Sequence, residues 1–390
     1  VICHLGFYKV ILKIMFKVIK KSKFGRIGEL STNHGLIETP VFMPPATRGY
    51  VKAIDSSDLE AIDVQILLVN ALHLYFKPGE SFIKQMGGIH QFMGWPHPVL
   101  SDSGGFQILS FNKNKNQWAK SNEKGIEFTS PYDGSKSFIT PEKAIEIQRD
   151  LNVDIIMVLD ECSLNKGPKA KIKESMERTN QFAKRSFAHY QKLFKNDSNP
   201  PLIFGIAQGG PYEDLRIASL KFINQIPFHG IALGGESIGY DFEKTLMILD
   251  WLEPYIDQTR PLYSMGAGAY PENVVDLIKK GVDMFDCVSP ARLARHGGLF
   301  NGEIIYRNNN LSFCSAFAKG ILKISNQKFK NDKGPIDQNC QCLTCQNYSR
   351  AYLRYLLLQK DPLYYRLATI HNLKFMVNLI KEIKKFIYDD

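Results

Sequence analysis

Two aspartates in the chain are placed to act together on one substrate bond. Asp102 lies in SDSGGFQ and Asp286 in VDMFDCVSPARLARHGG, and each ends a short apolar run. Paired carboxylates suit substitution at an anomeric carbon, because one can attack or stabilise an oxocarbenium-like centre while the other carries a proton. Helix capping by Asp102 and a surface salt-bridge network are the alternative interpretations of these acids.

A second group of residues matches the hydrogen-bonding pattern of a guanine. Asp160 in MVLDEC and Gln208 in FGIAQGG also end apolar runs. A carboxylate can accept from N1 and the 2-amino group of guanine, while a glutamine amide and the Gly235 N–H can donate to O6. Phe106 offers a flat apolar face for a heterocycle. Each residue alone is more often an ordinary polar or apolar loop residue, but together they predict a purine pocket.

The cysteines near the C-terminus predict a metal site. Cys340, Cys342 and Cys345 have the spacing C-x-C-x₂-C, and His371 is the only histidine that follows them. Three thiolates and one imidazole complete a tetrahedral zinc site with no open position, so the ion would be structural. Packing of the cysteines as small hydrophobic residues is the alternative.

Positive charge gathers at the two ends of the chain. Residues 1–30 carry seven Lys and Arg against one acid, and residues 291–390 carry sixteen against seven. Arg292 and Arg295 follow Asp286 closely, where they could grip the phosphates of a polynucleotide. A solvated basic face without a partner is the alternative interpretation.

The composition is that of a globular protein. Hydrophobic residues make up 44% and charged residues 23% of the 390 residues, which excludes disordered and fibrous classes. The seven cysteines are odd in number and partly clustered for metal binding, which favours a reducing, cytoplasmic compartment. Neither a signal peptide nor a membrane span fits the sequence. Residues 1–14 are interpreted as a possible upstream or non-native extension, because a strand-like run begins at Met15.

The elements that must position these residues are short apolar runs alternating with helical segments. Continuous apolar runs are typical of strands buried on both faces, and those at 41–47, 64–70, 98–102, 155–161, 202–208, 230–235, 261–267 and 284–290 are predicted strands. Helical spacing is found at 140–151, 171–193 and 271–281. The pattern predicts an α/β fold, an irregular (β/α)₈ TIM barrel over residues 15–305. Residues 306–390 are predicted to form a zinc-binding subdomain with closing helices. A doubly wound open sheet is the competing fold.

At this point the motifs resemble those of one family. SDSGGFQ, LDEC, the QGG of IAQGG, ALGG, SMGAG, FDCVSPARLARHG and the cysteine cluster occur in the order typical of bacterial tRNA-guanine transglycosylases, the queuine tRNA-ribosyltransferase family. The resemblance runs from about residue 16 to the end of the chain. It implies exchange of the guanine at the wobble position of tRNAs with a U-G-U anticodon triplet, in queuosine biosynthesis. The incoming base would be 7-aminomethyl-7-deazaguanine.

The resemblance also implies a role for each site residue. Asp286 would be the nucleophile that forms a covalent intermediate with the ribose, and Asp102 the general acid/base. The resemblance implies that the base is held by Ser103, Phe106, Asp160, Cys162, Gln208, Gly234, Gly235 and Met265. Arg292 and Arg295 would contact the tRNA anticodon stem-loop. Family members act as homodimers with one structural zinc ion per subunit, and the aromatic-basic segment 348–358 is a candidate dimer face.

Two departures from the family pattern concern the substrate. Glu236 follows the glycine pair where bacterial relatives usually have an apolar residue, so queuine is an alternative incoming base. Phe106 replaces a commoner tyrosine but keeps the stacking face. A zinc-bearing RNA-binding accessory subunit without catalysis is the alternative function, although it should lack one of the two rim aspartates.

Overall fold

Eight parallel strands close into a barrel. The computed structural model describes residues 15–108, 120–130, 132–162, 167–235, 238–239 and 241–390. The strands, in barrel order, are β4 (Val41–Met43), β5 (Leu67–Asn70), β6 (Val99–Asp102), β10 (Ile155–Met157), β11 (Leu202–Ala207), β12 (Gly230–Leu233), β13 (Leu262–Ser264) and β14 (Met284–Asp286). A parallel bridge between Pro45 and Leu68 joins the two outer strands β4 and β5. The predicted (β/α)₈ barrel is therefore confirmed, and the open doubly wound sheet is wrong.

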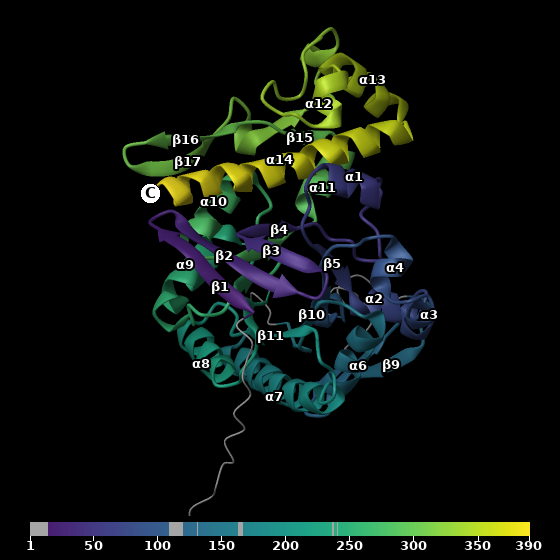
Figure 1. Cartoon of the computed structure of the whole chain (residues 1–390), viewed down its shortest axis with the longest axis vertical. Coiled ribbons are helices and arrows are strands. Elements are labelled where there is room, and N and C mark those ends of the chain that lie inside the picture. The colour runs from purple at the N-terminus through teal and green to yellow at the C-terminus, as the bar shows by residue number, and fades with distance from the viewer. Residues whose placement is uncertain (1–14, 109–119, 131, 163–166, 236–237, 240) are drawn as a thin grey trace, which may run out of the picture.

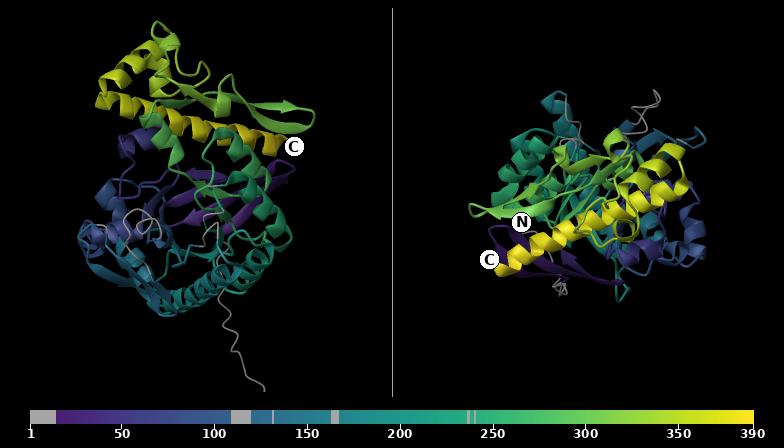
Figure 2. Two further views of the ribbon diagram at one scale, coloured as in Figure 1. Left: turned by 180° about the vertical axis from the view of Figure 1, so that it is seen from behind. Right: turned by 90° about the horizontal axis from the view of Figure 1, so that it is seen from above.

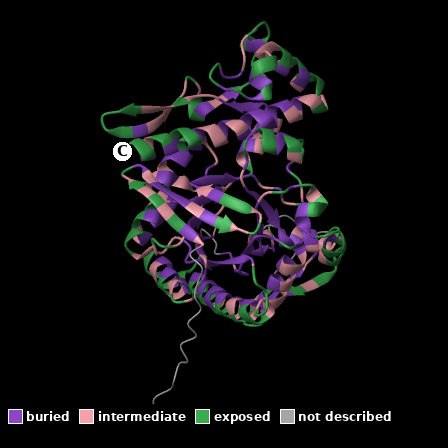
Figure 3. Ribbon diagram, in the orientation of Figure 1, coloured by how far each residue is buried: buried purple, intermediate pink, exposed green. Residues whose placement is uncertain are grey.

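Burial on both faces explains why the strands read as continuous apolar runs. Seven of the eight strands contain only buried residues, and Figure 3 shows them inside the shell of helices. The surrounding helices are α1 (Ser56–Ala61), α2 (Ala71–Phe76), α3 (Glu80–Gln85), α4 (Ile89–Met93), α6 (Pro141–Leu151), α7 (Lys169–Leu193), α8 (Glu213–Asn224), α9 (Phe242–Leu252) with the short η1 (Glu253–Tyr255), α10 (Pro271–Lys279) and α11 (Ser289–Arg295). The three predicted helical segments correspond to α6, α7 and α10.

Two antiparallel sheets make the barrel irregular, and the sequence predicted neither as a sheet. One contains β1 (Phe16–Ser22), β2 (Gly25–Thr32) and β3 (Gly35–Thr39). The other contains β7 (Lys120–Asn122), β8 (Gly125–Thr129) and β9 (Lys136–Ile139), between β6 and α6. The first sheet is attached to the barrel by a buried ion pair, in which Arg26 Nε donates to Asp283 Oδ1 over 2.9 Å. Asp283 precedes β14, so this pair holds the strand that ends in Asp286.

The chain beyond β14 builds an appendage against one end of the barrel (Figures 1 and 2). Its elements are β15 (Gly298–Phe300), β16 (Glu303–Arg307), β17 (Asn310–Cys314), η2 (Ala318–Gly320), β18 (Ile321–Lys323), η3 (Gln327–Phe329), α12 (Leu343–Asn347), α13 (Arg350–Gln359) and α14 (Pro362–Asp389). The division predicted between residues 305 and 306 stays a prediction, and β16 contains both residues.

Helix α14 connects the appendage with the barrel and the first antiparallel sheet. Asn372 Nδ2 donates to the carbonyls of Pro290 and Gly298 over 2.9 and 3.0 Å. Near the other end of the helix, Lys384 Nζ donates to Glu38 in β3 over 2.7 Å. Among the residues that the structure describes, no helix combines the length and apolar composition needed to cross a membrane.

Candidate active site

The two predicted catalytic aspartates lie at the carboxyl ends of their strands, β6 and β14, which is the rim where barrel active sites form. Burial, together with the nearby charge of Asp286, raises the pKa of Asp102 to about 6. Burial also raises the pKa of Asp286. Because the negative charge of Asp286 disfavours ionisation of Asp102, the two carboxylates belong to one electrostatic site.

The hydrogen bonds of Asp286 fix one of its oxygens. Oδ1 accepts from the Tyr263 hydroxyl over 2.7 Å and from the Gly266 backbone N–H over 2.8 Å. Both bonds favour the ionised carboxylate and oppose the effect of burial on its pKa. Neither bond involves Oδ2. An ionised Asp286 can therefore present Oδ2 to a substrate while Oδ1 holds the carboxylate in place.

Asn70 holds the other aspartate. Its Nδ2 donates to Asp102 Oδ2 over 3.0 Å, and the register of β5 and β6 places the two residues opposite each other. The orientation of the amide is set because its Oδ1 accepts from the His73 N–H at the start of α2. This cap leaves only the NH₂ end of Asn70 to face the carboxylate. The capping interaction thus positions the predicted proton carrier.

Asp160 and Gln208 form the second polar pair of the rim. Gln208 Nε2 donates to Asp160 Oδ2 over 2.6 Å, and both side chains are buried. Burial, followed by the charge of Asp102, raises the pKa of Asp160 to about 7. A Cβ at Gly105 would lie 2.2 Å from Asp160 Oδ1, so the SDSGG loop packs directly against the LDEC loop. The SDSGGFQ and LDEC motifs therefore form one wall of the site together.

The other predicted base contacts surround this pair. A Cβ at Gly234 would lie 2.7 Å from Gln208 Nε2, which brings the glycine loop against the amide. Ser103 is fully buried, and its Oγ has no hydrogen-bond partner among the described residues. The remaining members are Gly235, two residues after β12, the buried Cys162 and the half-buried Phe106 and Met265. Glu236 lies outside the described residues.

The cysteine cluster forms as predicted. The ligand atoms of Cys340, Cys342, Cys345 and His371 lie within 4.8 Å of one another, and all four residues are buried. The distance from Cys345 Sγ to His371 Nδ1 is 3.2 Å. On the other side of the ring, Nε2 lies 2.7 Å from the Phe300 carbonyl, so Nε2 carries the proton and Nδ1 is free to bind a metal. The donor set fits a metal ion, with zinc the ion that this combination of ligands favours.

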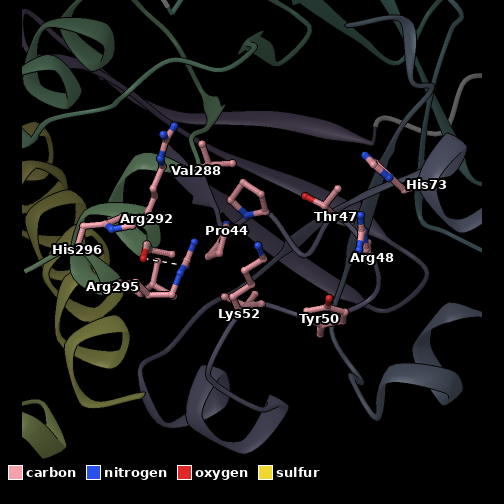
Figure 4. Close-up of a pocket in the computed structure, with 14 residues that line it drawn as sticks. Pro44, Thr47, Arg48, Tyr50, Lys52, His73, Val288, Arg292, Arg295 and His296 are labelled. Atoms are coloured by element: carbon pink, nitrogen blue, oxygen red, sulfur yellow. Dashed lines mark hydrogen bonds between the residues drawn. The ribbon is translucent and has the colours of Figure 1, made fainter. Parts of the chain in front are cut away.

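A cationic cavity opens beside the end of β14. Its volume is about 510 Å³, and its lining includes Val288, two residues after Asp286, and both predicted arginines of α11, Arg292 and Arg295. Figure 4 shows that Arg48 and Lys52, from the loop after β4, line the same cavity. Sequence reasoning had found only the arginines of α11. Four cations from two separate segments thus meet at one cavity.

Several contacts of the site were missed by sequence reasoning. Asn70 ends an apolar run as Asp102 and Asp160 do, so the strand-end signal could have found it. Tyr263 lies inside a strand and is buried like an ordinary core residue, and its sequence gives no sign of its bond to Asp286. Arg48 and Lys52 lie far in the sequence from the arginines of α11, and only the barrel closure brings them together.

A closed barrel that brings Asp102 and Asp286 to the same rim as the buried Asp160–Gln208 pair fits an enzyme of the glycosyl-transfer class. Comparison with known proteins agrees with this class. The family model of queuine tRNA-ribosyltransferase matches residues 21–390. The chain is 42% identical over 377 residues to the queuine tRNA-ribosyltransferase of Janthinobacterium sp. (strain Marseille), covering 95% of this chain and 94% of the relative.

Other relatives give the same result. The queuine tRNA-ribosyltransferase of Francisella tularensis subsp. novicida (strain U112) is 42% identical over 95% of this chain and 94% of its own length. That of Vibrio campbellii is 41% identical, over 97% of this chain and 94% of its own length. The chain therefore belongs to the queuine tRNA-ribosyltransferase family, whose members are pentosyltransferases. The family and enzyme class predicted from the motifs are confirmed.

Replacing Tyr263 with phenylalanine should raise the pKa of Asp286, because the ionised carboxylate loses one of its two donors. If Asp286 is the nucleophile, as predicted, its protonated form cannot attack, so activity at low pH should be lost first and the acidic limb of the pH profile of kcat/KM should move to higher pH. Hydrogen bonds to charged groups contribute about 1.5–3 kcal/mol, so the limb should move by roughly one to two pH units, and activity at pH values below it should fall by roughly 10- to 100-fold.

Tyr190→Phe is the matched control for this variant. The Tyr190 hydroxyl is also buried and donates to the Pro201 carbonyl over 2.7 Å, away from the rim. This variant should keep the parental pH profile. An unshifted acidic limb in Tyr263→Phe would show that the hydroxyl does not set the ionisation of Asp286.

Removal of one cysteine should empty the metal site. Cys342→Ala leaves three ligands, so we expect the zinc content measured by atomic absorption to fall from one ion per chain to near zero. The appendage should loosen and tRNA binding should weaken while the barrel persists. Cys314→Ala removes an exposed cysteine outside the cluster and should keep the ion. Unchanged zinc in Cys342→Ala would refute this ligand set.

Proposed function

We propose that the protein exchanges guanine at the wobble position of tRNAs with a U-G-U anticodon triplet for 7-aminomethyl-7-deazaguanine. The observation that carries the proposal is the pair of electrostatically coupled aspartates, Asp102 and Asp286, at the rim with the buried Asp160–Gln208 pair, which would form a slot for a guanine-like base. The reaction would be a step of queuosine biosynthesis in the cytoplasm.

The first half of the exchange uses both acids. Asp286 Oδ2 attacks the ribose C1′, so that an O–C1′ bond forms while the C1′–N9 bond of guanosine breaks. The departing guanine takes the electron pair and receives a proton from Asp102. A pKa of about 6 keeps a usable fraction of Asp102 protonated near neutral pH, while the two donors to Asp286 favour its ionised form.

The second half reverses these roles. The deazaguanine loses its N9 proton to Asp102 as N9 attacks C1′, and Asp286 departs as a carboxylate. Two successive displacements restore the original anomer. The covalent intermediate holds the tRNA while one base leaves the slot and the other enters it, so a single pocket serves both bases.

Base recognition is assigned to the second polar pair and its neighbours. Asp160 would accept from N1 and the 2-amino group, while Gln208 and the Gly235 N–H donate to O6. The buried Ser103 hydroxyl lacks a partner among the described residues and can bond to the base edge. Phe106 and Met265 would cover the two faces of the ring. Cys162 and Gly234 complete the wall of the slot.

The cationic cavity would hold the anticodon loop. A base inside a folded tRNA must be turned out of its stack before a side chain can reach C1′, and a single-stranded loop is the least costly place for this. Arg292 and Arg295 would contact the flanking phosphates, with Arg48 and Lys52 lining the same cavity. Tyr50 is exposed in the same lining and offers a stacking face.

A homodimer is proposed through α13. Tyr352, Tyr355 and Leu358 are exposed on this helix, and Tyr355 is 58% exposed. Tyr352 stacks between Tyr348 and Tyr355, with ring centroids 5.5 and 6.5 Å apart. Exposed aromatic side chains on a rigid helix are typical of protein–protein contacts. In the dimer, one subunit would catalyse while the other helps to hold the tRNA.

Queuine is the second candidate base. The observation that favours it is Glu236, whose carboxylate could bind a larger cationic substituent than the aminomethyl group.

A non-catalytic accessory subunit is disfavoured because both rim aspartates are present. Zinc would serve the fold of the appendage and would not take part in the exchange.

The covalent step has a direct test. With Asp286→Ala, the enzyme–tRNA adduct should disappear from denaturing gels, because no oxygen remains to bond to C1′. Exchange of labelled guanine into tRNA should fall to background. Asp276→Ala, a change at a partly buried aspartate of α10, is the control and should keep the adduct. An adduct that survives in Asp286→Ala would overturn the assignment of the nucleophile.

The identity of the incoming base can be measured by competition. Labelled guanine already in tRNA should be displaced by 7-aminomethyl-7-deazaguanine at least about tenfold more efficiently, by kcat/KM, than by queuine. A tenfold preference corresponds to roughly 1.4 kcal/mol, about one hydrogen bond. A preference for queuine would instead support queuine as the incoming base. Displacement by neither base would contradict an exchange enzyme.

A further inference from the structure

Arg216 on α8 is a buried cation in an unusual environment. Its side chain is 0% exposed, and none of the ion pairs among the described residues includes it. Its contacts are backbone carbonyls: Nε donates to Gly210 over 2.8 Å, and Nη1 donates to Gly234 over 2.7 Å and more weakly to Ala207 over 3.4 Å. Burial lowers the pKa of Arg216 to about 10, so the guanidinium is still charged at neutral pH.

Such burial is costly for stability. A buried charge without an opposite charge loses its hydration and regains only part of it from carbonyl dipoles. The cost is visible at Arg216 Nη2, which is buried and has no hydrogen-bond partner among the described residues. Buried groups that lower the stability of the fold in this way are concentrated at functional sites, where they serve the chemistry.

The carbonyls of Gly210 and Gly234 belong to the loops that follow β11 and β12. Gly210 follows Gln208, and Gly234 lies in the glycine pair proposed to bind the base. In a trans peptide the C=O and the following N–H point in opposite directions. Because the Gly234 carbonyl points to Arg216, the N–H of Gly235 in the same peptide points away from it.

The other side of this peptide faces the base-reading pair. A Cβ on Gly234 would lie 2.7 Å from Gln208 Nε2, and that atom donates to Asp160. Gly235 has a φ of +103°, in the region that favours glycine. A peptide between two glycines can rotate with little steric hindrance, so its orientation needs an external constraint. Among the described residues, Arg216 is the side chain that donates to its carbonyl.

We infer that Arg216 is a positioning residue that sets specificity for bases with an oxygen at position 6. By bonding to the carbonyls of Gly210 and Gly234, it keeps the N–H of Gly235 directed at the slot beside Gln208. A base with an oxygen acceptor at this position gains a hydrogen bond from a donor already in place. The inference rests on the proposed function, because it assumes that the slot holds a guanine-like base.

The test compares guanine with 6-thioguanine in the full-length enzyme. 6-Thioguanine keeps the N1–H and the 2-amino group but presents sulfur, a weak acceptor, at position 6. In Arg216→Lys the charge remains, but a single ammonium cannot reach both carbonyls as the guanidinium does. We expect the KM for guanine in tRNA exchange to rise about tenfold, while the inhibition constant of 6-thioguanine rises less than about threefold.

The ratio of the KM for guanine to the inhibition constant of 6-thioguanine, measured in one preparation, does not depend on the fraction of folded enzyme. A partly unfolded variant therefore still gives a valid result. Arg185→Lys is the control at a distance from the glycine loops: Arg185 on α7 also donates to two carbonyls, those of Glu123 and Lys124, and pairs with Glu142, and its replacement should leave the ratio unchanged. Arg216→Met, without charge, should lower the guanine preference at least as much as Arg216→Lys.

Two outcomes would overturn the inference, and they differ. Equal losses for guanine and 6-thioguanine in Arg216→Lys would show that Arg216 supports the fold without directing the Gly235 N–H. If the parental enzyme itself does not prefer guanine to 6-thioguanine, then no donor reads position 6. In that case the proposed base recognition fails together with the role of Arg216.

Discussion

Burial of several carboxylates at one barrel rim is the constraint from which the chemistry follows. Asp102 and Asp160 have raised pKa values because they are buried, and a neighbouring carboxylate raises each further. Like charges in a medium of low polarity disfavour one another's ionisation, so the group is partly protonated near neutral pH. The environment also distinguishes the two acids: Asp286 has two donors that stabilise its charge, while the nearby charge of Asp286 disfavours ionisation of Asp102.

The rest of the fold keeps these acids in register. The β5–β6 pairing sets Asn70 against Asp102, and the capping bond of Asn70 to α2 fixes which end of its amide faces the acid. On the other side, the Arg26–Asp283 pair anchors the strand that ends in Asp286. Helix α14 ties the metal-binding appendage to the barrel through Asn372. Elements distant from the rim therefore limit the freedom of the reacting groups.

Most of the barrel and much of the site could be predicted from local signals. Each of the eight apolar runs contains a barrel strand, although several strands are shorter than the run, and Asp102 and Asp286 end theirs as expected. The β7–β9 sheet was not predicted because its short, half-exposed strands lack a continuous apolar pattern. Arg216 was missed because an arginine in an amphipathic helix is normally solvated. Its burial depends on two loops that approach it from different strands.

The sequence by itself determined which chemical groups are present and the order in which they follow the strands. Burial of apolar runs and metal-ligand spacing act over a few residues, so the fold class and the Cys₃His cluster could be predicted from the chain alone. Tertiary structure decided the rest: which oxygen of Asp286 is held, how the Gly234 peptide is turned, and that Arg48 meets Arg292 at one cavity. These features depend on contacts between distant segments, because pKa values and hydrogen-bond directions are set by neighbours in space.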